Sequence, residues 1–228
     1  MDKTTLRKLS CGLYIIGTKD GEKNAGCVVN TVTQATANPV TLTVCINKDN
    51  YTNACIKKTK AFAVSILSQS IKENTIALFG FSSSKDRDKF SEVPYGLTPS
   101  GMPYIKEGVT GYIQCKVIDF IDDYTHTIFI AEADEAANLP NAQGASDLPI
   151  TYDYYHNVIK GKTPEKASSF IAEPVNAQEK SAPASGSGSY RCSICGYVFP
   201  GSKEEFEKLP DDYKCPICKV PKNKFKLS

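Results

Sequence analysis

The sequence contains no tryptophan, only two histidines and two methionines, and no long uninterrupted run of apolar residues. None of its apolar stretches approaches the roughly 18 residues of a membrane-spanning helix, so we expect no membrane segment. Residues 1–5 are polar, which argues against a signal peptide, and we expect a cytoplasmic protein. Lysine and arginine (27) nearly balance aspartate and glutamate (25), which argues against a nucleic-acid binder built on bulk charge.

Cysteine, in contrast, is abundant, and its nine residues fall into two groups. An odd number of cysteines without an export signal is poor material for a disulfide framework. Five are scattered, and we expect them to be small apolar groups of the core: Cys11, Cys27, Cys45, Cys55 and Cys115. The other four crowd into the last 39 residues: Cys192, Cys195, Cys215 and Cys218.

A change in composition separates a large N-terminal part of the chain from a small C-terminal part. Residues 182–189 are small and polar, as in flexible linkers, and apolar periodicity is lost from about residue 165. We therefore expect a large domain at residues 1–166, a linker at residues 167–189 and a small domain at residues 190–228. The small domain holds eight lysines and arginines against five acidic residues, so it is basic.

The sequence pattern of the large domain predicts mainly β structure. Residues 40–46 alternate apolar residues with threonine, the period of a half-buried strand, and Asp20-Gly21 is a strong hairpin signal. Further strands are predicted at residues 12–17, 25–35, 61–67, 108–120 and 127–134, with helices near 52–59 and 71–79. Many antiparallel strands with few helices favour a closed or nearly closed barrel.

Two Cys-x-x-Cys pairs in the small domain predict a metal site. The two-residue spacing in Cys192/Cys195 and in Cys215/Cys218 lets both sulfurs of a pair face one ion, and two pairs complete a tetrahedral thiolate cage. Geometry leaves zinc and iron both open, because both metals accept four thiolates in a tetrahedron. The aromatic residues favour a redox site, since a dry aromatic surrounding tunes the potential: Tyr190, Tyr197, Phe199, Phe206, Tyr213 and Phe225.

Residues 192–201 read Cys-Ser-Ile-Cys-Gly-Tyr-Val-Phe-Pro-Gly, and residues 209–218 read Leu-Pro-Asp-Asp-Tyr-Lys-Cys-Pro-Ile-Cys. With Phe225, these motifs resemble rubredoxin, a one-electron carrier, and the resemblance implies a mononuclear iron held by the four cysteines. The chain departs from the family at Tyr213, where tryptophan is usual, and at Lys219, where glycine is usual. A left-handed backbone at that position costs a lysine about 1 kcal/mol.

No Gly-x-Gly-x-x-Gly motif follows a predicted strand, so a Rossmann nicotinamide site has no support. Hydroxyl and amide side chains gather instead at Asn24 and at residues 30–34 and 47–52, where they could hold a ribityl-phosphate chain and the polar edge of a ring. A helix that begins at Thr52 would offer backbone amides to an anion, with Lys48 adding charge. Taken alone, each such cluster is more typical of turns than of a binding site.

Residues 24–36, 46–52, 79–90, 126–132 and 152–155 resemble successive blocks of the flavin reductase-like family. The resemblance covers about residues 3–166 and implies a Greek-key split β-barrel, usually a homodimer, with FMN near the subunit interface. The fold expected for the whole chain is therefore mainly β, a split barrel followed by a small iron-thiolate domain.

Carried onto this chain, the resemblance implies a set of FMN-binding residues, to which the polar cluster adds Asn47. The expected residues for the ring and ribityl chain are Asn24, Asn30, Thr31 and Thr33. Those expected for the phosphate are Lys48, Tyr51, Thr52 and Lys89, with Lys85 and Arg87 as alternatives to Lys89. His126, as the candidate catalytic residue, and Tyr154 or Tyr155 are expected near the ring.

A flavin domain followed by a rubredoxin domain closely resembles the high-molecular-weight rubredoxins of anaerobes. The resemblance implies that NAD(P)H reduces FMN, that electrons pass singly to iron, and that an acceptor such as a flavodiiron oxygen or nitric oxide reductase takes them. Two alternatives stay open. The chain is a passive carrier reduced by another protein, or a zinc-ribbon interaction module on a non-catalytic flavin-binding barrel.

Overall fold

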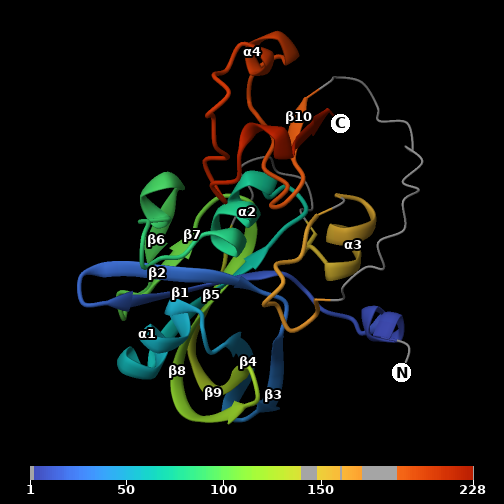
Figure 1. Ribbon diagram of the computed structural model, residues 1–228. Coiled ribbons are helices and arrows are strands. Elements are labelled where there is room, and N and C mark those ends of the chain that lie inside the picture. The colour runs from blue at the N-terminus through green and yellow to red at the C-terminus, as the bar shows by residue number, and fades with distance from the viewer. Residues whose placement is uncertain (1–2, 140–147, 160, 171–188, 228) are drawn as a thin grey trace.

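The computed structural model describes residues 3–139, 148–159, 161–170 and 189–227. Its large domain is built on a seven-stranded antiparallel sheet with the strand order β2-β1-β5-β8-β9-β4-β3 (Figure 1). These strands are β1 (Tyr14–Asp20), β2 (Lys23–Val29), β3 (Val32–Ala37), β4 (Val40–Asn47), β5 (Ala61–Leu67), β8 (Val109–Asp123) and β9 (His126–Asn138). A separate two-stranded ribbon consists of β6 (Tyr95–Leu97) and β7 (Pro103–Ile105).

The sheet curls around an apolar core to which six of its strands contribute. Alternate residues along these strands point inward, as the two-residue period of a strand requires. The core includes Ile16, Cys27, Val44, Phe62, Cys115 and Phe129, one from each of β1, β2, β4, β5, β8 and β9. Phe62 and Phe129 are fully buried, and each burial stabilises the fold by about 1.5–3 kcal/mol. Contacts of β2, one edge strand, with β4, the strand next to the other edge, bring the two ends of the curled sheet together.

Helix α1 (Tyr51–Thr59) follows β4 and packs on β1 and β2. The side chain of Asn50 caps its N-terminus by accepting a hydrogen bond from the backbone N–H of Thr52 at 3.0 Å. The helix ends at Lys60, whose left-handed backbone (φ 56°) lets its N–H reach the carbonyl of Ile56. The start of α1 is thereby fixed directly beside the end of β4.

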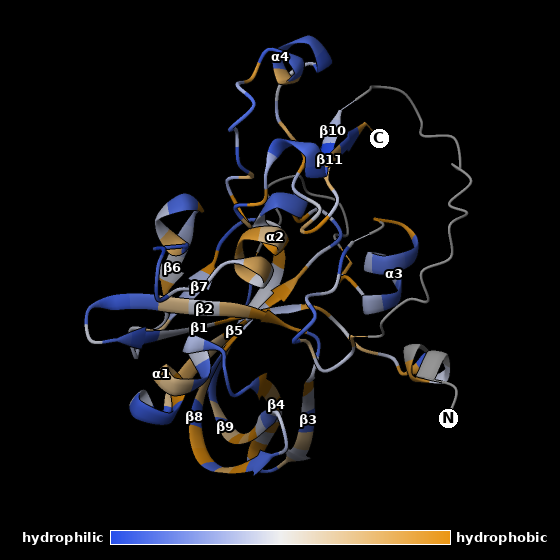
Figure 2. Ribbon diagram, in the orientation of Figure 1, coloured by the Kyte–Doolittle hydropathy of each residue, from blue (hydrophilic) through white to orange (hydrophobic). Residues whose placement is uncertain are grey.

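Helix α2 (Glu73–Phe81) covers the outer face of β2 and lies between the sheet and the small domain (Figure 1). Figure 2 shows that α2 is largely apolar, which agrees with contacts on more than one side. Helix α3 (Tyr152–Asn157) is capped by the Thr151 side chain, which accepts from the Tyr154 N–H at 3.1 Å. Two short 3₁₀ turns, η1 (Lys3–Lys8) and η2 (Phe90–Glu92), complete the large domain.

The small domain consists of the ribbon β10 (Tyr190–Cys192) and β11 (Phe225–Leu227), helix α4 (Lys203–Glu207) and the 3₁₀ turn η3 (Lys222–Lys224). Ser202 and Glu205 form a reciprocal capping box that begins α4. Four of the other aromatic residues named from the sequence pack around Phe206, which is buried and stacks on Tyr190 at 4.0 Å between ring centroids. The fifth, Tyr197, contacts the ring of Phe225. A dry aromatic core therefore supports the metal-binding turns.

The expected fold, a mainly β barrel followed by a small separate domain, is confirmed. Apart from shifts of a few residues at other element ends, three differences from the sequence predictions stand out. The β1–β2 hairpin turns at Gly21 (φ 61°) and Glu22, because Asp20 still pairs with Lys23. The strand predicted at residues 25–35 is two strands, β2 and β3, separated by Asn30 and Thr31. Helix α2 begins at Glu73, since Ser68–Ile71 form a turn.

Of the predicted linker, residues 171–188 lie outside the described part of the chain. Within the described residues, no helix is long and apolar enough to cross a membrane.

Candidate four-cysteine metal site and flavin cavity

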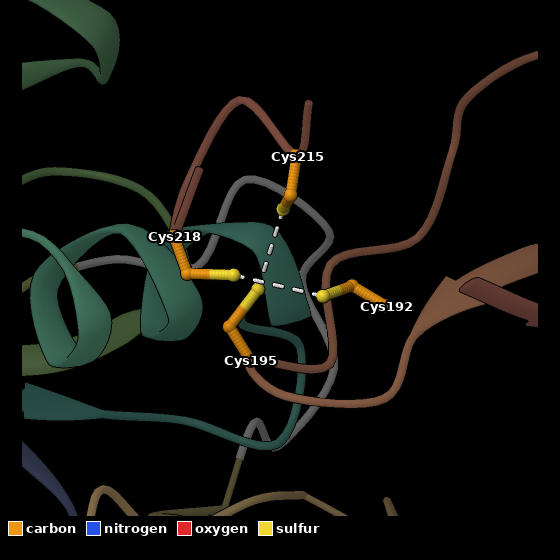
Figure 3. A group of neighbouring side chains, drawn as sticks. All are labelled: Cys192, Cys195, Cys215 and Cys218. Carbon is orange, nitrogen blue, oxygen red and sulfur yellow. Dashed lines mark hydrogen bonds between the residues drawn. The ribbon is translucent and has the colours of Figure 1, made fainter. Parts of the chain in front are cut away.

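The four clustered cysteines converge on one point in the small domain (Figure 3). Their sulfur atoms all lie within 4.8 Å of one another, with Cys192 Sγ 3.6 Å from Cys218 Sγ and Cys195 Sγ 3.6 Å from Cys215 Sγ. Metal–sulfur bonds of about 2.3 Å in a tetrahedron place the sulfurs about 3.8 Å apart. The arrangement therefore fits one mononuclear tetrahedral metal centre.

The two Cys-x-x-Cys turns, which we call the first knuckle (residues 192–195) and the second knuckle (residues 215–218), have the same backbone design. The N–H of Gly196 donates to the carbonyl of Cys192 at 3.0 Å, and the N–H of Lys219 donates to the carbonyl of Cys215 at 2.9 Å. Both Gly196 (φ 78°) and Lys219 (φ 63°) are left-handed. The lysine thus occupies the strained conformation that the sequence indicated for it.

Electrostatics differs among the four cysteines. A hydrogen bond from the Cys195 thiol, together with backbone hydrogen bonds from Cys218 and Ile217, lowers the pKa of Cys215 to about 5. The same shared bond raises the pKa of Cys195, and burial raises the pKa of Cys218. Cys192, Cys195 and Cys215 are buried, whereas Cys218 is half-buried. Four closely packed sulfur atoms are the donor set that iron or zinc requires, and a bound cation would favour their thiolate form.

The five scattered cysteines have a different environment from the metal-site cysteines. Cys27, Cys55 and Cys115 are buried, as predicted, and burial raises the pKa of Cys27 to about 11 and that of Cys115 to about 12. Cys11 and Cys45 are only half-buried, so the core assignment is wrong for these two. Cys45 lies at the edge of a cavity, described next.

A cavity of about 580 Å³, which we call the flavin cavity, opens between the barrel and the small domain. Its volume is in the range of cofactor sites. It is lined by residues 28–30, 45–47, 49–51, 80–83, 126, 162–168, 170, 193 and 194. Four of the residues expected for FMN meet here from separate segments: Asn30, Asn47, Tyr51 and His126.

Antiparallel pairing explains how these four residues converge. Asn47, at the end of β4, is the cross-strand partner of His126, at the start of β9. Tyr51 begins α1, and its hydroxyl donates to Asp20 Oδ2 at 2.5 Å. Asn30 occupies the break between β2 and β3 that the sequence pattern did not indicate.

Partial burial lowers the pKa of His126 below its usual value, with the nearby Lys48 acting in the same direction. The ring is thereby kept neutral near pH 7. Its Nδ1 shares a hydrogen bond of 2.8 Å with the Thr125 hydroxyl. His126 thus offers the cavity a neutral imidazole of fixed orientation.

Two other expected residues each carry a buried oxygen atom without a hydrogen-bond partner among the described residues. These atoms are Asn24 Oδ1 on β2 and Thr52 Oγ1 in α1. Neither residue lines the flavin cavity, so these two oxygens are not counted among its ligand contacts. The amide side chains that do line it, Asn30, Asn47 and Asn50, suit a ligand rich in hydroxyl and carbonyl groups, as a flavin is.

The remaining expected residues do not line the flavin cavity. The hydroxyl of Thr31 donates to the Cys45 carbonyl at 3.0 Å, and Thr33 is exposed on β3. Lys48 is exposed in the turn after β4. Among the phosphate alternatives, Lys85 is exposed, and Arg87 contacts the small domain.

Lys89 departs most from its expected role. Its side chain is only 1% exposed, and Nζ donates to the carbonyls of Phe79 at 3.2 Å and Ser82 at 2.9 Å. These carbonyls lie at the C-terminal end of α2, where a positive charge is favourable. Burial lowers the pKa of Lys89 to about 8. Lys89 closes the end of α2 and does not face the cavity.

Of the two expected tyrosines, Tyr155 lies nearer to the cavity. It lines a neighbouring space of about 60 Å³ that shares Val28 and Asn30 with the flavin cavity, and its hydroxyl donates to the Lys162 carbonyl at 3.0 Å. Tyr154 lines neither space. Tyr152, which the sequence interpretation did not single out, lines the small space and bonds Ser169 at 2.6 Å.

The sequence also gave no signal for the segment of residues 162–170, which lies across the flavin cavity. Lys166 Nζ pairs with Asp49 at 2.8 Å, and the Lys166 carbonyl accepts from Asn47 Nδ2 at 2.9 Å. The Ser168 hydroxyl reaches Asn30 Oδ1 at 3.5 Å. The segment has no apolar period, so only its tertiary contacts reveal it.

Comparison with known families assigns both parts of the chain. The model described as "Flavin reductase like domain" matches residues 6–158, and the model described as "Rubrerythrin, rubredoxin-like domain" matches residues 190–226. These matches place the four cysteines in the second family's domain and the flavin cavity mainly in the first.

Two curated relatives share long alignments with the chain. The "High molecular weight rubredoxin" of Moorella thermoacetica is 37% identical and covers 99% of this chain and 99% of its own length. The "Ferric-chelate reductase (NAD(P)H)" of Archaeoglobus fulgidus is 36% identical over 75% of this chain and 98% of its own length.

Solved structures support the barrel fold. An NADH:FAD oxidoreductase of Streptomyces globisporus superposes with a TM-score of 0.55 at 24% identity, over 61% of this chain and 84% of its own. An FMN-binding protein of Thermus thermophilus gives a TM-score of 0.53 at 18% identity, over 60% of this chain and 74% of its own.

The fold and the two sites define an electron-transfer oxidoreductase that binds a flavin in its barrel and iron in its four-cysteine site. Its similarity extends over both domains and nearly the whole chain. The chain belongs to the flavin reductase-like family, within the group of high molecular weight rubredoxins.

Proposed function

We propose that this chain takes hydride from NAD(P)H at FMN in the flavin cavity and passes single electrons through the four-cysteine iron to an external acceptor. When bound, the cofactors supply the conversion from two electrons to one, since a flavin accepts two and releases them singly whereas iron carries one. The relatives named for NAD(P)H and NADH oxidation support a nicotinamide donor.

One observation carries the proposal. Ser193 and Ile194, which lie between two iron ligands in the first knuckle, line the same cavity as Asn30 and His126. Ile194 is 46% exposed although it is apolar, so it projects into space that a ring could cover. The metal site therefore borders the flavin cavity within one chain, as direct transfer between the two requires.

The chain's own residues prepare the flavin cavity. The side-chain amides of Asn30 and Asn47 offer donors and acceptors at its polar edge, while Val28 and Phe81 supply apolar walls. Residues 162–168 and 170 form part of the wall of the cavity. We assign to His126, as a neutral imidazole, a hydrogen bond to the ring or the nicotinamide.

The proposed acceptor is a flavodiiron protein that reduces oxygen or nitric oxide. The resemblance to high-molecular-weight rubredoxins suggests it, and the basic small domain supports an acceptor with an acidic surface. The proposal also includes a homodimer. Exposed Val40, Ile118 and Ile121 on the barrel sheet support a second copy there.

Anaerobic mixing with NADH and then with NADPH tests donor competence. We expect at least one donor to bleach the flavin absorbance at a rate that supports turnover, followed by loss of the ferric-thiolate bands. If neither donor reduces the flavin at such a rate, the chain is a carrier reduced by another protein. A colourless small domain that holds zinc after expression in its own host would instead indicate an interaction module.

A further inference from the structure

The small domain rests on the barrel through polar contacts at the start of α2. The Arg191 guanidinium, next to the iron ligand Cys192, pairs with the Glu73 carboxylate through both nitrogens, Nη1 with Oε2 and Nη2 with Oε1 at 3.4 Å. The Asn74 side chain accepts from the Val198 N–H at 3.1 Å and donates to the Val198 carbonyl at 3.5 Å. An ion pair and a two-way amide contact thus hold the first knuckle's side of the domain.

A second contact holds the other knuckle. Arg87 Nη1 donates to the carbonyl of Pro216 at 2.6 Å, and Glu92 fixes the same guanidinium through Nη2 at 2.6 Å. Arg87, Pro216 and Ile217 line a cavity of about 670 Å³ between the domains. The barrel therefore contacts the second knuckle directly, and it contacts the first through its flanking residues Arg191 and Val198.

These contacts give the two similar knuckles different surroundings. Ser193 and Ile194 of the first knuckle border the flavin cavity, whereas no residue of the second knuckle does. Cys218 of the second knuckle is the metal ligand that stays half-buried rather than buried. The docked arrangement turns the first knuckle towards the flavin and leaves Cys218 as the ligand nearest to solvent.

We propose that Glu73, Asn74 and Arg87 form a docking clamp for the small domain, and that the clamp makes the first knuckle the point of electron entry from the flavin. The electron-entry part of this inference rests on the proposed function, whereas the docking of the small domain rests on the contacts alone. The three clamp residues do not line the flavin cavity and act on the metal site only through the segments of the small domain that they hold. They are therefore positioning residues. Because the Glu73–Arg191 pair is partly exposed, salt weakens it.

The ¹⁵N relaxation of the zinc-substituted full-length protein tests the clamp without electron transfer. In the unaltered chain, we expect amides of residues 190–227 to tumble at the rate of the barrel at low salt. Glu73→Arg or Arg191→Glu frees the domain and shortens its correlation time about twofold or more, and the double charge swap restores it. Glu132→Arg is the matched control, because it makes the same charge change on an exposed β9 position and leaves tumbling unchanged.

Several outcomes overturn the clamp: a small domain that already tumbles freely in the unaltered chain, single variants without effect, or a charge swap that fails to restore the docked rate. Asn74→Ala, which removes no charge, gives a weaker release in the same assay and serves if Glu73→Arg does not fold. With iron and flavin loaded, Glu73→Arg slows flavin-to-iron transfer about tenfold while hydride transfer to flavin stays unchanged. Normal docking without any transfer would contradict the proposed function alone.

Discussion

The metal site and the flavin cavity are built from the sequence in opposite ways. The four iron ligands lie within residues 192–218, in two local turns whose spacing already brings the sulfurs together. The flavin cavity collects residues from position 28 to position 170 and adds Ser193 and Ile194 from the other domain. A site made of local turns can be predicted from the sequence, whereas a cavity formed by tertiary packing cannot. This contrast leads to tests of each site by variants that leave the other intact.

The largest effect is expected from Cys195→Ser. The change removes one of four thiolates, so we expect loss of the ferric-thiolate absorbance and of most bound iron, with flavin content unchanged. Metal analysis and absorption spectra measure both. Cys11→Ser is the control, because Cys11 lies outside the cluster and should keep the iron. Flavin loss in the Cys195 variant would show that the two sites are not separable.

Lys89→Met tests whether this lysine is structural. The folded pKa is about 8 against an ordinary value of 10.5, so between these values the unfolded chain binds more protons than the folded one. The lysine therefore makes the free energy of unfolding rise with pH across that window, by up to about 3 kcal/mol. Chemical denaturation from pH 8 to pH 10.5 should show a smaller rise for the methionine variant.

Flavin affinity provides the companion measurement for Lys89. Since the ammonium group faces the end of α2, we expect the methionine variant to retain flavin affinity once folded. A large loss of FMN binding, with equal pH slopes of stability in both proteins, would return Lys89 to the phosphate role that the resemblance implied.

Asn30→Ala sharpens the assignment of the flavin cavity. Asn30 lines the cavity, so the loss of its amide should weaken FMN binding about tenfold, the size of one hydrogen bond in a shielded site. Thr33→Ala is the matched comparison, because the resemblance names Thr33 but the structure exposes it away from the cavity. Fluorescence titration with FMN measures the affinity of both variants. Equal losses would contradict the cavity as the sole flavin site.

The smallest effect is expected at the two left-handed positions of the knuckles. Lys219→Gly should stabilise the small domain by about 1 kcal/mol, because glycine adopts the φ of 63° without strain. Gly196→Ala should destabilise it by a similar amount. No heavy atom lies within 4 Å of the added methyl group, so backbone strain alone acts there. Thermal unfolding of the iron-loaded proteins measures both changes. The two substitutions must change the stability of the small domain in opposite directions.

Local patterns accounted for much of the fold. Alternation predicted β4, and the strand predicted at residues 61–67 is β5. The spacing of the cysteines predicted both knuckles, and the resemblance to rubredoxin indicated the left-handed backbone at Lys219. The hairpin turn moved by one residue because the pairing of Asp20 with Lys23 decided it, which no single-strand pattern reveals.

The flavin site was only partly predictable. Asn30, Asn47, Tyr51 and His126 were expected from the resemblance and do meet at the cavity. Lys89 was displaced because its charge closes α2, a contact set by how residues 82–90 fold back. The segment of residues 162–170 and the docking of the first knuckle depend on contacts between distant parts of the chain. They have no signature in composition or period.

The rate of iron reduction after anaerobic addition of the competent nicotinamide tests the central claim most directly, when followed as a function of protein concentration. Because one chain brings the first knuckle to the flavin cavity, we predict a first-order rate that is independent of concentration. A rate that rises in proportion to protein concentration, or flavin reduction without loss of the ferric-thiolate bands, would contradict direct transfer within the molecule.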